Sequence, residues 1–263
     1  MMIIKIGGGS EINIKGIIED LAGQQEQFII VHGANALRDD LAARLSIKKN
    51  VITSVRGYSS VLSDENVIDL QMMAYAGLRN KRIVELCQQH GINAVGLSGL
   101  DGKMIQGQRN QGIRVKEGSK IKLVRDFSGK PRTINTDLLN LLLSNGYRPV
   151  LCVPIIDENN FAINSENDDI VRVLQEAIKV DTIIQFIEAP GFLNDPDDPA
   201  SLVSKITRTE LLHREEQVEG RIKRKMLALR QLFEGGAAKV IITDGRTKNP
   251  LKDVLAGKGT VIS

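Results

Sequence analysis

Short apolar runs alternate with segments of helical periodicity along most of the chain. Mostly apolar runs, typical of buried strands, occur at residues 3–6, 28–31, 94–97, 150–153, 182–187 and 240–243. Apolar positions at helical spacing predict helices over residues 14–22, 36–45, 64–89, 138–143, 170–178 and 227–233. This alternation predicts an α/β protein with a mainly parallel central sheet.

One segment departs from the alternation and carries most of the uneven charge. Over residues 104–124 polar and apolar positions alternate around Glu117-Gly118-Ser119, which predicts an antiparallel hairpin inserted into the α/β frame. Between Lys103 and Arg132 nine Lys and Arg stand against two acidic residues, so this segment carries +7 and the rest of the chain −4, for a net +3. The predicted ribbon is therefore basic, and it is either a solvated face or a surface for an acidic partner.

The composition excludes several classes of protein. A chain of 263 residues with 42% hydrophobic residues is long enough for a large core. No apolar stretch reaches the length of a membrane span and no signal peptide is evident, so we expect a cytoplasmic protein with neither a membrane nor a nucleic-acid partner. Cys87 and Cys152 lie far apart in apolar segments, which favours reduced thiols. The three histidines do not cluster, and we expect no metal site built by the protein.

The first strand leads into a turn suited to anions. Lys5 interrupts an apolar run, and a buried ammonium is costly unless a negative group meets it. Gly7-Gly8-Gly9 follows, and a turn without side chains lets backbone N–H groups approach an anion closely. A second glycine turn, at Gly33, follows the next strand and opens a helix. An edge strand with a solvated lysine is the alternative.

No familiar nucleotide-binding loop is present, neither GxxxxGK[ST] nor GxGxxG. The remaining candidates are a basic run at residues 221–225, which precedes the predicted helix over 227–233, and an acidic turn at residues 164–169. Phosphoryl transfer requires fixed cations and N–H donors around a group whose negative charge is spread. Two lysines from opposite ends of the chain, glycine N–H groups and a carboxylate that holds the lysines would meet that requirement. Each motif alone is equally compatible with a solvated run or a helix cap.

Together these motifs resemble the amino acid kinase family, specifically its acetylglutamate kinase branch. The resemblance extends over nearly the whole chain. It rests on Ile4-Lys5-Ile6-Gly7-Gly8, Val31-His32-Gly33, Gly77-Leu78-Arg79-Asn80-Lys81, Gly146-Tyr147-Arg148-Pro149-Val150, Ala162-Ile163-Asn164 and the closing Gly257-Lys258-Gly259-Thr260. Three further stretches, "GLSGLDG", "GRIKRK" and "DGRTKNPL", are most similar to kinases that act on aminoadipate or glutamate attached to the small acidic carrier protein LysW.

The resemblance implies a three-layer αβα sandwich with two lobes, whose expected boundary lies near residues 157–164. Residues 1–160 would bind the acyl substrate and form a homodimer contact, and residues 161–263 would bind ATP with Mg²⁺. The reaction would transfer the γ-phosphoryl group to a side-chain carboxylate and give an acyl phosphate. We expect no arginine control, because the helix that arginine-sensitive relatives carry before the first strand is not seen here.

The resemblance also assigns roles to individual residues. Lys5 and Lys225 match the two lysines that stabilise the transition state, and Asp168 matches the aspartate that organises them, with Glu166 as the alternative register. Gly8 and Gly33 match the glycines whose N–H groups hold the migrating phosphoryl group. The nucleotide is expected at Gly7, Gly8 and Gly191, and the acyl substrate at Gly33, Ala34 and Asn164.

Three positions depart from the family pattern. Ala34 stands where a second glycine is usual, and a left-handed backbone there would cost roughly 1 kcal/mol or more. Val61 stands where the branch has an arginine for the substrate carboxylate, a contact worth about 1.5–3 kcal/mol, and Arg56 is a candidate replacement. The acidic turn also has Asn and Glu where Asp and Gly are commoner.

These departures leave several functions open. Carrier-bound aminoadipate or glutamate is the leading acceptor, and free N-acetylglutamate is the second. A non-catalytic regulator that binds a nucleotide or an amino acid would explain Val61 but not the retained Lys5, Lys225 and Asp168. A kinase for phosphate monoesters would make His32 catalytic.

Overall fold

The computed structural model describes residues 1–47, 50–53, 55, 59–117, 120–195, 197–217, 220–237 and 239–263. Within these ranges the side chains of residues 51–53, 59–61, 116–117, 217 and 220–225 lie outside the description. No helix in the described ranges is long and apolar enough to cross a membrane.

A single central sheet contains all six strands predicted from the apolar runs. Its order is β14-β16-β15-β13-β1-β2-β10-β5, and each pairing is parallel except that of β15 with β16. The strands are β1 (Met2–Ile6), β2 (Phe28–His32), β5 (Ala94–Ser98), β10 (Arg148–Cys152), β13 (Thr182–Ile187), β14 (Lys205–Ile206), β15 (Lys239–Asp244) and β16 (Thr260–Ile262). The mainly parallel sheet predicted from the sequence is thus confirmed.

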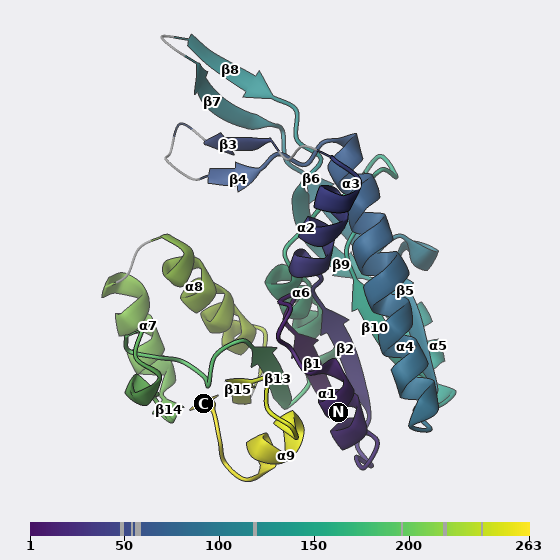
Figure 1. The fold of residues 1–263 in the computed structure, drawn as a ribbon, viewed down its shortest axis with the longest axis vertical. Helices are drawn as coiled ribbons and strands as arrows, with labels where there is room; N and C mark the ends of the chain where they lie inside the picture. Colours follow the sequence, from purple (N-terminus) through teal and green to yellow (C-terminus); the bar gives the residue numbers. More distant parts are fainter. Residues whose placement is uncertain are drawn as a thin grey trace.

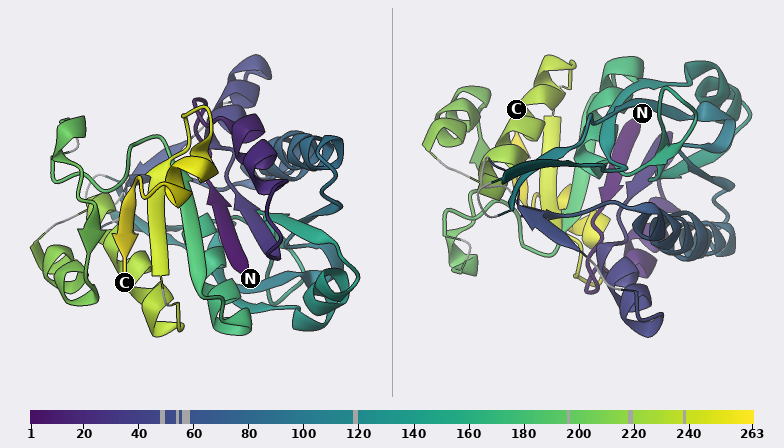
Figure 2. Two further views of the ribbon diagram at one scale, coloured as in Figure 1. Left: turned by 90° about the horizontal axis from the view of Figure 1, so that it is seen from below. Right: turned by 90° about the horizontal axis from the view of Figure 1, so that it is seen from above.

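Helices cover both faces of this sheet, which confirms the three-layer αβα sandwich (Figures 1 and 2). One face packs against α1 (Ile14–Leu21), α4 (Asn80–Gln89) and α9 (Pro250–Leu255). The other packs against α5 (Thr136–Ser144), α6 (Asn167–Ile178) and α8 (Gly220–Glu234). Two further helices are α2 (Asn35–Arg44) and α7 (Arg208–Gln217), which packs on α8.

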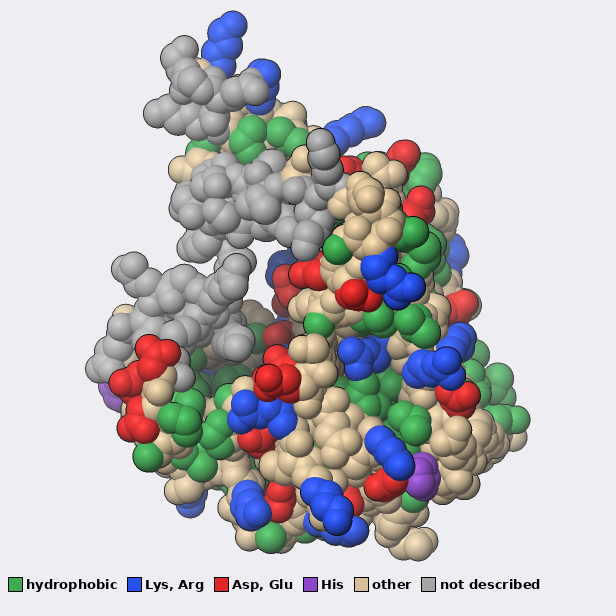
Figure 3. Space-filling model, viewed as in Figure 1, with side chains coloured by type: hydrophobic (Ala, Val, Ile, Leu, Met, Phe, Trp, Pro, Cys, Tyr) green, Lys and Arg blue, Asp and Glu red, His purple; other side chains and the backbone are tan. Residues whose placement is uncertain are grey.

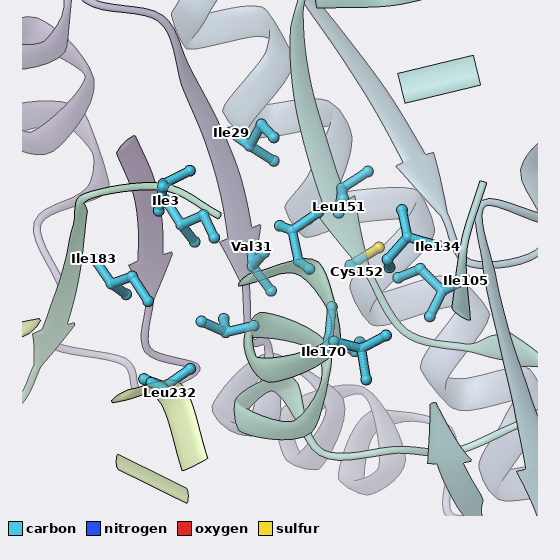
Figure 4. Close-up of a cluster of buried hydrophobic side chains, with 14 of the residues drawn as sticks. Ile3, Ile29, Val31, Ile105, Ile134, Leu151, Cys152, Ile170, Ile183 and Leu232 are labelled. Carbon is cyan, nitrogen blue, oxygen red and sulfur yellow. The ribbon is translucent and has the colours of Figure 1, made fainter. Parts of the chain in front are cut away.

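The alternation of side chains along β1 divides the core between the two faces. Ile4 and Ile6 belong to the cluster under α1 and α4, whereas Ile3 belongs to the cluster under α6 and α8. In that second cluster Ile3, Ile183 and Leu232 lie on the same side of the sheet (Figure 4). Lys5 shares the face of Ile3, because side chains two apart in a strand point the same way. The polar residue of β1 therefore faces α6 and α8.

The long helix predicted over residues 64–89 forms with a change of pitch. It consists of α3 (Glu65–Gln71), a π-helical segment η1 (Met72–Arg79) and α4, and Asp64 caps its start by accepting from the Val67 N–H at 3.0 Å. A π-helical segment is rare and frequently accompanies functional sites. Here it carries Tyr75, whose contacts are described below.

The predicted hairpin is confirmed in part. β7 (Ile113–Glu117) and β8 (Lys120–Val124) pair antiparallel and project from the body (Figure 1). The alternation over residues 105–109 belongs instead to β6 (Ile105–Arg109), in a separate sheet of order β12-β11-β6-β9. That sheet is completed by β9 (Gly129–Ile134), β11 (Ile155–Ile156) and β12 (Ala162–Ile163), and a short hairpin of β3 (Val51–Thr53) and β4 (Ser59–Val61) lies beside β7.

The charge of the segment 103–132 is therefore spread over more than the ribbon. Arg109 stacks on the Phe127 ring at 3.8 Å, and Lys130 pairs with Asp169. The prediction that the whole basic cluster lies on the hairpin was wrong, because β6 and β9 return part of it to the body. Arg114 and Lys120 do lie exposed on the hairpin.

The second half of the chain also differs from the prediction. Residues 221–225 lie inside α8, which starts at Gly220, rather than before a helix. α7 was not predicted, because it lacks a clear apolar stripe, and two-residue β14 is too short to be recognised. The sheet continues without a break from β1 to β13, so strands from both halves of the chain flank the centre.

Candidate active site

Lys5 and Asp168 form an ion pair at the carboxyl edge of the sheet. The Lys5 ammonium donates to Asp168 Oδ1, and the two side chains are 13% and 33% exposed. Asp168 lies in the first turn of α6, and the backbone of Glu166 is the N-cap of that helix. Of the two registers left open by the sequence, Asp168 is the one that meets Lys5.

A largely apolar pocket opens beside this ion pair. Its volume is about 330 Å³, and Lys5, Asp168 and Gln185 form its polar part. Residues after β13, including Gly191 and Phe192, form one wall, and Met226, Leu229 and Leu232 of α8 form another. The space is hollowed between the part of the molecule that carries α8 and the part that carries α2 and α6 (Figure 3). An apolar pocket with charged groups at one end suits a ligand with a flat apolar part and an anionic part.

The two glycine turns touch each other next to Lys5. A Cβ atom placed on Gly8 would lie 2.7 Å from the Asn35 nitrogen, and one on Gly33 would lie 2.8 Å from the Gly8 nitrogen. No side chain fits at either position without moving backbone. The Gly8 N–H has no acceptor among the described residues, and it lies at the start of α2, where a helix attracts anions.

The backbone N–H groups of Gly7 and Gly33, unlike that of Gly8, are already hydrogen-bonded within the protein. The Gly7 N–H donates to Phe186 O and the Gly33 N–H donates to Ile6 O, each at 2.9 Å, so both extend the sheet. Among the glycine N–H groups expected to hold a phosphoryl group, the Gly8 N–H is therefore the free one. Ala34 has φ −150°, so the third position of this turn requires no left-handed backbone and alanine fits without that cost.

His32 is buried and neutral beneath the second glycine turn. It is 0% exposed, and burial lowers its pKa to about 3. The Asn80 amide lies 3.2 Å from His32 Nε2 and donates to Val150 O at 2.9 Å. With Nε2 accepting from Asn80, the proton is on Nδ1, 3.4 Å from Gly33 O. His32 thus supports the turn and stays uncharged at neutral pH, which disfavours a catalytic role for it.

Tyr75 of the π-helical segment lies against the start of α2. It is 3% exposed, and its hydroxyl donates to Asn35 Oδ1. Burial raises the pKa of Tyr75 to about 12, although the Arg38 guanidinium and the Ala34 N–H oppose the shift. The amide of Asn35 is thereby fixed at the rim of the glycine turns.

Asn164 is held in place on the other side of the site. Its N–H donates to Phe127 O at 2.7 Å, and its side-chain amide donates to Ser63 Oγ at 3.2 Å. Asp126, 2% exposed, in turn accepts from the Ser63 N–H at 2.8 Å. The expected substrate residue therefore belongs to a connected polar network that joins the segment after β4 to the segment between β12 and α6.

Some expected residues fall outside what the structure describes. The backbone of Lys225 lies in α8, next to the pocket residue Met226, but its side chain is outside the described part. The same holds for the side chain of Val61, and Arg56 is outside entirely. In the described ranges no three His, Cys, Asp or Glu side chains gather as metal ligands.

The sequence analysis predicted no role for three residues of the site: Tyr75, Asn80 and Gln185. Asn80 was noted within a motif, and Tyr75 lies among the apolar positions of a long helix, where core packing is the usual explanation. Gln185 carries the same signal as Lys5, a polar residue inside an apolar strand, and this signal could have identified it.

The chain is similar to several known proteins over most or all of its length. The model of the amino acid kinase family matches residues 1–244. A [LysW]-aminoadipate kinase from Thermus thermophilus is 35% identical over 269 residues, covering 100% of both chains. An acetylglutamate kinase from Methanopyrus kandleri is 29% identical over 264 residues, again covering 100% of both. Among solved structures, N-acetylglutamate synthase from Neisseria gonorrhoeae shares the fold with a TM-score of 0.76 and 19% identity, covering 100% of this chain and 59% of that chain.

Proposed function

The chain belongs to the amino acid kinase family, and from this premise we propose that it phosphorylates the side-chain carboxylate of an aminoadipate or glutamate held by a small acidic carrier protein. ATP is the phosphoryl donor and the product is an acyl phosphate, as expected of an enzyme of lysine-type biosynthesis. The observation that carries the proposal is the Lys5–Asp168 pair at the polar end of the pocket, beside the Gly8 turn.

The chemistry follows from the groups around Lys5. A carboxylate acceptor is already ionised at neutral pH, so its oxygen can attack the γ-phosphorus without a general base. Lys5 and Lys225 neutralise the charge that spreads over the transferred group, and the Gly8 N–H donates to one of its oxygens. Asp168 keeps the Lys5 ammonium in position. The bond to the β-phosphate oxygen breaks, and ADP leaves.

The two ligands take opposite sides of Lys5. We assign ATP to the pocket between β13 and α8, with Gly191 in its wall and Mg²⁺ carried by the phosphates. The acyl substrate lies toward Ala34 and Asn164, where the Ser63 network ends. The ATP walls thus come from residues 161–263 and most of the acyl side from residues 1–160.

The projecting hairpin supports a carrier protein as the bearer of the acid. Arg114 and Lys120 are exposed there, and Ile121 and Leu123 are 67% and 65% exposed. Lys and Arg side chains extend from its outer end (Figure 3). Positive charge beside apolar surface suits an acidic protein that is steered by charge and then buries a small apolar contact.

The substrate experiment compares aminoadipate attached to an acidic carrier with free N-acetylglutamate. Acyl phosphate is trapped with hydroxylamine, and ADP release is measured in parallel. We expect kcat/KM to favour the carrier conjugate at least about tenfold. Comparable low rates on both acids would contradict the acceptor. A chain that binds nucleotide but shows no turnover with either acid would favour the non-catalytic regulator.

The docking experiment uses charge reversal. Lys120→Glu should raise the KM for the carrier conjugate several-fold and weaken its salt dependence, with the rate on N-acetylglutamate unchanged. Lys15→Glu is the matched control, because Lys15 is 70% exposed on α1, remote from the hairpin. Equal effects of the two variants would exclude the hairpin as the docking surface.

We also propose a cytoplasmic homodimer. Met73 and Leu78 on the π-helical segment are 42% and 41% exposed, and such apolar surface on the long helix supports a subunit contact. The two cysteines are buried and unpaired, which is consistent with a reducing compartment.

A further inference from the structure

Gln185 is a polar residue at the centre of an apolar strand. β13 reads Thr-Ile-Ile-Gln-Phe-Ile, and Gln185 is 6% exposed. The register of the sheet places it directly beside Lys5 of β1 on one side and Ile242 of β15 on the other. Gln185 and Lys5 therefore point to the same face of the sheet, toward α6 and α8.

The amide of Gln185 has no hydrogen-bond partner among the described residues, and it lies on the wall of the pocket, although only 6% of the residue is exposed. Gln175, another buried glutamine of this chain, shows the usual situation. Its Nε2 donates to Val180 O at 3.0 Å and its Oε1 accepts from the Val180 N–H at 3.1 Å. Buried amides are nearly always paired, because an unpaired one loses its hydrogen bonds to water without replacement. An unpaired amide at Gln185 therefore suggests that a ligand supplies the partner.

The surroundings of Gln185 indicate what that ligand is. Gln185 lines the same pocket as Lys5 and Asp168, and the rest of its neighbourhood is apolar, formed by Met226 and Leu232. In Figure 4, Leu232 lies on the side of the sheet that Ile183, two residues before Gln185, also faces. At this end of the pocket the ligand group is the one that Lys5 attracts, and that group is anionic. An amide offers two N–H donors to such a group.

We infer that the Gln185 side chain donates a hydrogen bond to the β- or γ-phosphate of the bound nucleotide, as a neutral donor beside the charged Lys5. The inference rests on the proposed function, since it takes the pocket between β13 and α8 to be the ATP site. Gln185 then contributes to the affinity for the polyphosphate, whereas Lys5 contributes to the transfer. Gln185 lies beside Lys5 on the adjacent strand, at the polar end of the pocket. The apolar wall that contains Phe192 is then available for the adenine base of the nucleotide.

Titration calorimetry with AMP-PNP and AMP on the full chain tests this inference. Gln185→Leu should weaken AMP-PNP binding at least about tenfold, the effect of losing a hydrogen bond to a charged group, and leave AMP binding unchanged. Gln185→Glu should weaken AMP-PNP binding further, because a carboxylate replaces the donors and repels phosphate. Gln89→Leu, on an exposed face of α4, is the matched control and should bind both nucleotides normally.

Thermal unfolding without ligand separates binding from structure. Gln185→Leu should unfold at the same temperature as the unmodified chain or higher, because it removes an unpaired amide from an apolar setting. Gln185→Met has a similar length and gives a second apolar variant if leucine does not fold. Unchanged AMP-PNP affinity in a folded variant overturns the inference, and so does an equal loss for AMP, which would assign Gln185 to the nucleoside. If the unmodified chain binds no AMP-PNP, the proposed function fails and the inference with it.

Discussion

Replacement of Asp168 by asparagine tests how the site holds its lysine. The change keeps the size of the side chain but removes the charge that pairs with Lys5. Lys5 is 13% exposed, so its ammonium depends on Asp168 more than a solvated lysine would. Asp169, the next residue, pairs with Lys130, which is 56% exposed. Both aspartates lie in the first turn of α6, and therefore Asp169→Asn removes the same charge from the same helix end.

The two variants should differ strongly in activity and less in stability. Asp168→Asn should lower kcat about 10²–10³-fold, since a misplaced donor at a charged transition state typically costs that much, or about 3–4 kcal/mol. Its loss of unfolding free energy should be about 1–2 kcal/mol, between the values for exposed and fully buried pairs. Asp169→Asn should cost about 0.5 kcal/mol and change kcat less than about threefold.

Coupled ADP release at saturating ATP gives kcat, and urea unfolding followed by circular dichroism gives stability. We expect a loss of kcat in Asp168→Asn but not in Asp169→Asn, and a loss larger than the fraction of unfolded protein accounts for. If both variants lose activity to the same degree, the effect comes from the charge of the helix end, and the role assigned to Asp168 is wrong. An Asp168→Asn variant with full activity would refute the role directly.

Three further predictions concern the glycine turns, His32 and a buried carboxylate. Gly8→Ala should lower kcat at least about 100-fold in a phosphoryl-transfer assay, because its Cβ would meet the Asn35 nitrogen at 2.7 Å and displace the anion-binding N–H. His32 has a pKa of about 3 in the folded chain against 6.5 unfolded, so the unfolded state binds the extra proton and stability falls as pH decreases through this window. Urea unfolding at pH 6.5 and 4.5 should show a loss about 2.3 kcal/mol larger for the unmodified chain than for His32→Gln. Asp20→Ala should cost about 2–3 kcal/mol with little effect on kcat, since its 1% exposed carboxylate accepts two N–H groups of α9 at 3.1 Å, one of them from Lys252.

Each of these has a control within the chain. Gly23→Ala places a Cβ in ordinary contact, 3.7 Å from Asp20 O, and should leave activity unchanged. Equal pH dependence of the unmodified chain and His32→Gln would show that the imidazole is protonated in the folded state. Lys252→Ala should cost less than about 1 kcal/mol, because that lysine is 69% exposed. A larger loss there would mean that the ion pair, not the cap on α9, is what Asp20 contributes.

The fold was largely predictable because strands and helices of this chain carry strong patterns. Every strand predicted from an apolar run exists, since a parallel sheet covered on both faces requires continuous apolar sequence. The start of α8 was missed for the converse reason: residues 221–225 are almost all basic, and helical periodicity first becomes visible at Met226. The sequence did not reveal that residues 105–109 pair with β9 in a separate sheet whereas residues 113–124 form a hairpin. Alternation of polar and apolar residues predicts a strand but does not identify the strand with which it pairs.

The site was predictable only where a residue contradicts its own surroundings. Lys5 stands out in an apolar run, and Gly8 stands out in a run of glycines that a strand does not need. The pairing of Lys5 with Asp168 spans 163 positions, and no local pattern carries a contact of that separation. It was expected solely through the resemblance, as was Lys225, whose role remains a prediction. Tyr75 was hidden because a buried tyrosine on a long helix looks like any core residue.

The central place of β1 has a consequence for how the chain is made. β1 pairs with β2, which follows it closely, but also with β13, which begins at Thr182. At about 5–20 residues per second, a ribosome needs roughly 10–35 s after it has made β1 to reach β13. During that interval β1 presents an unpaired apolar edge, with Lys5 still lacking Asp168. Nascent chains of this protein should therefore bind chaperones that recognise exposed strands until the second half emerges, and truncation before β13 should yield aggregation rather than a stable half.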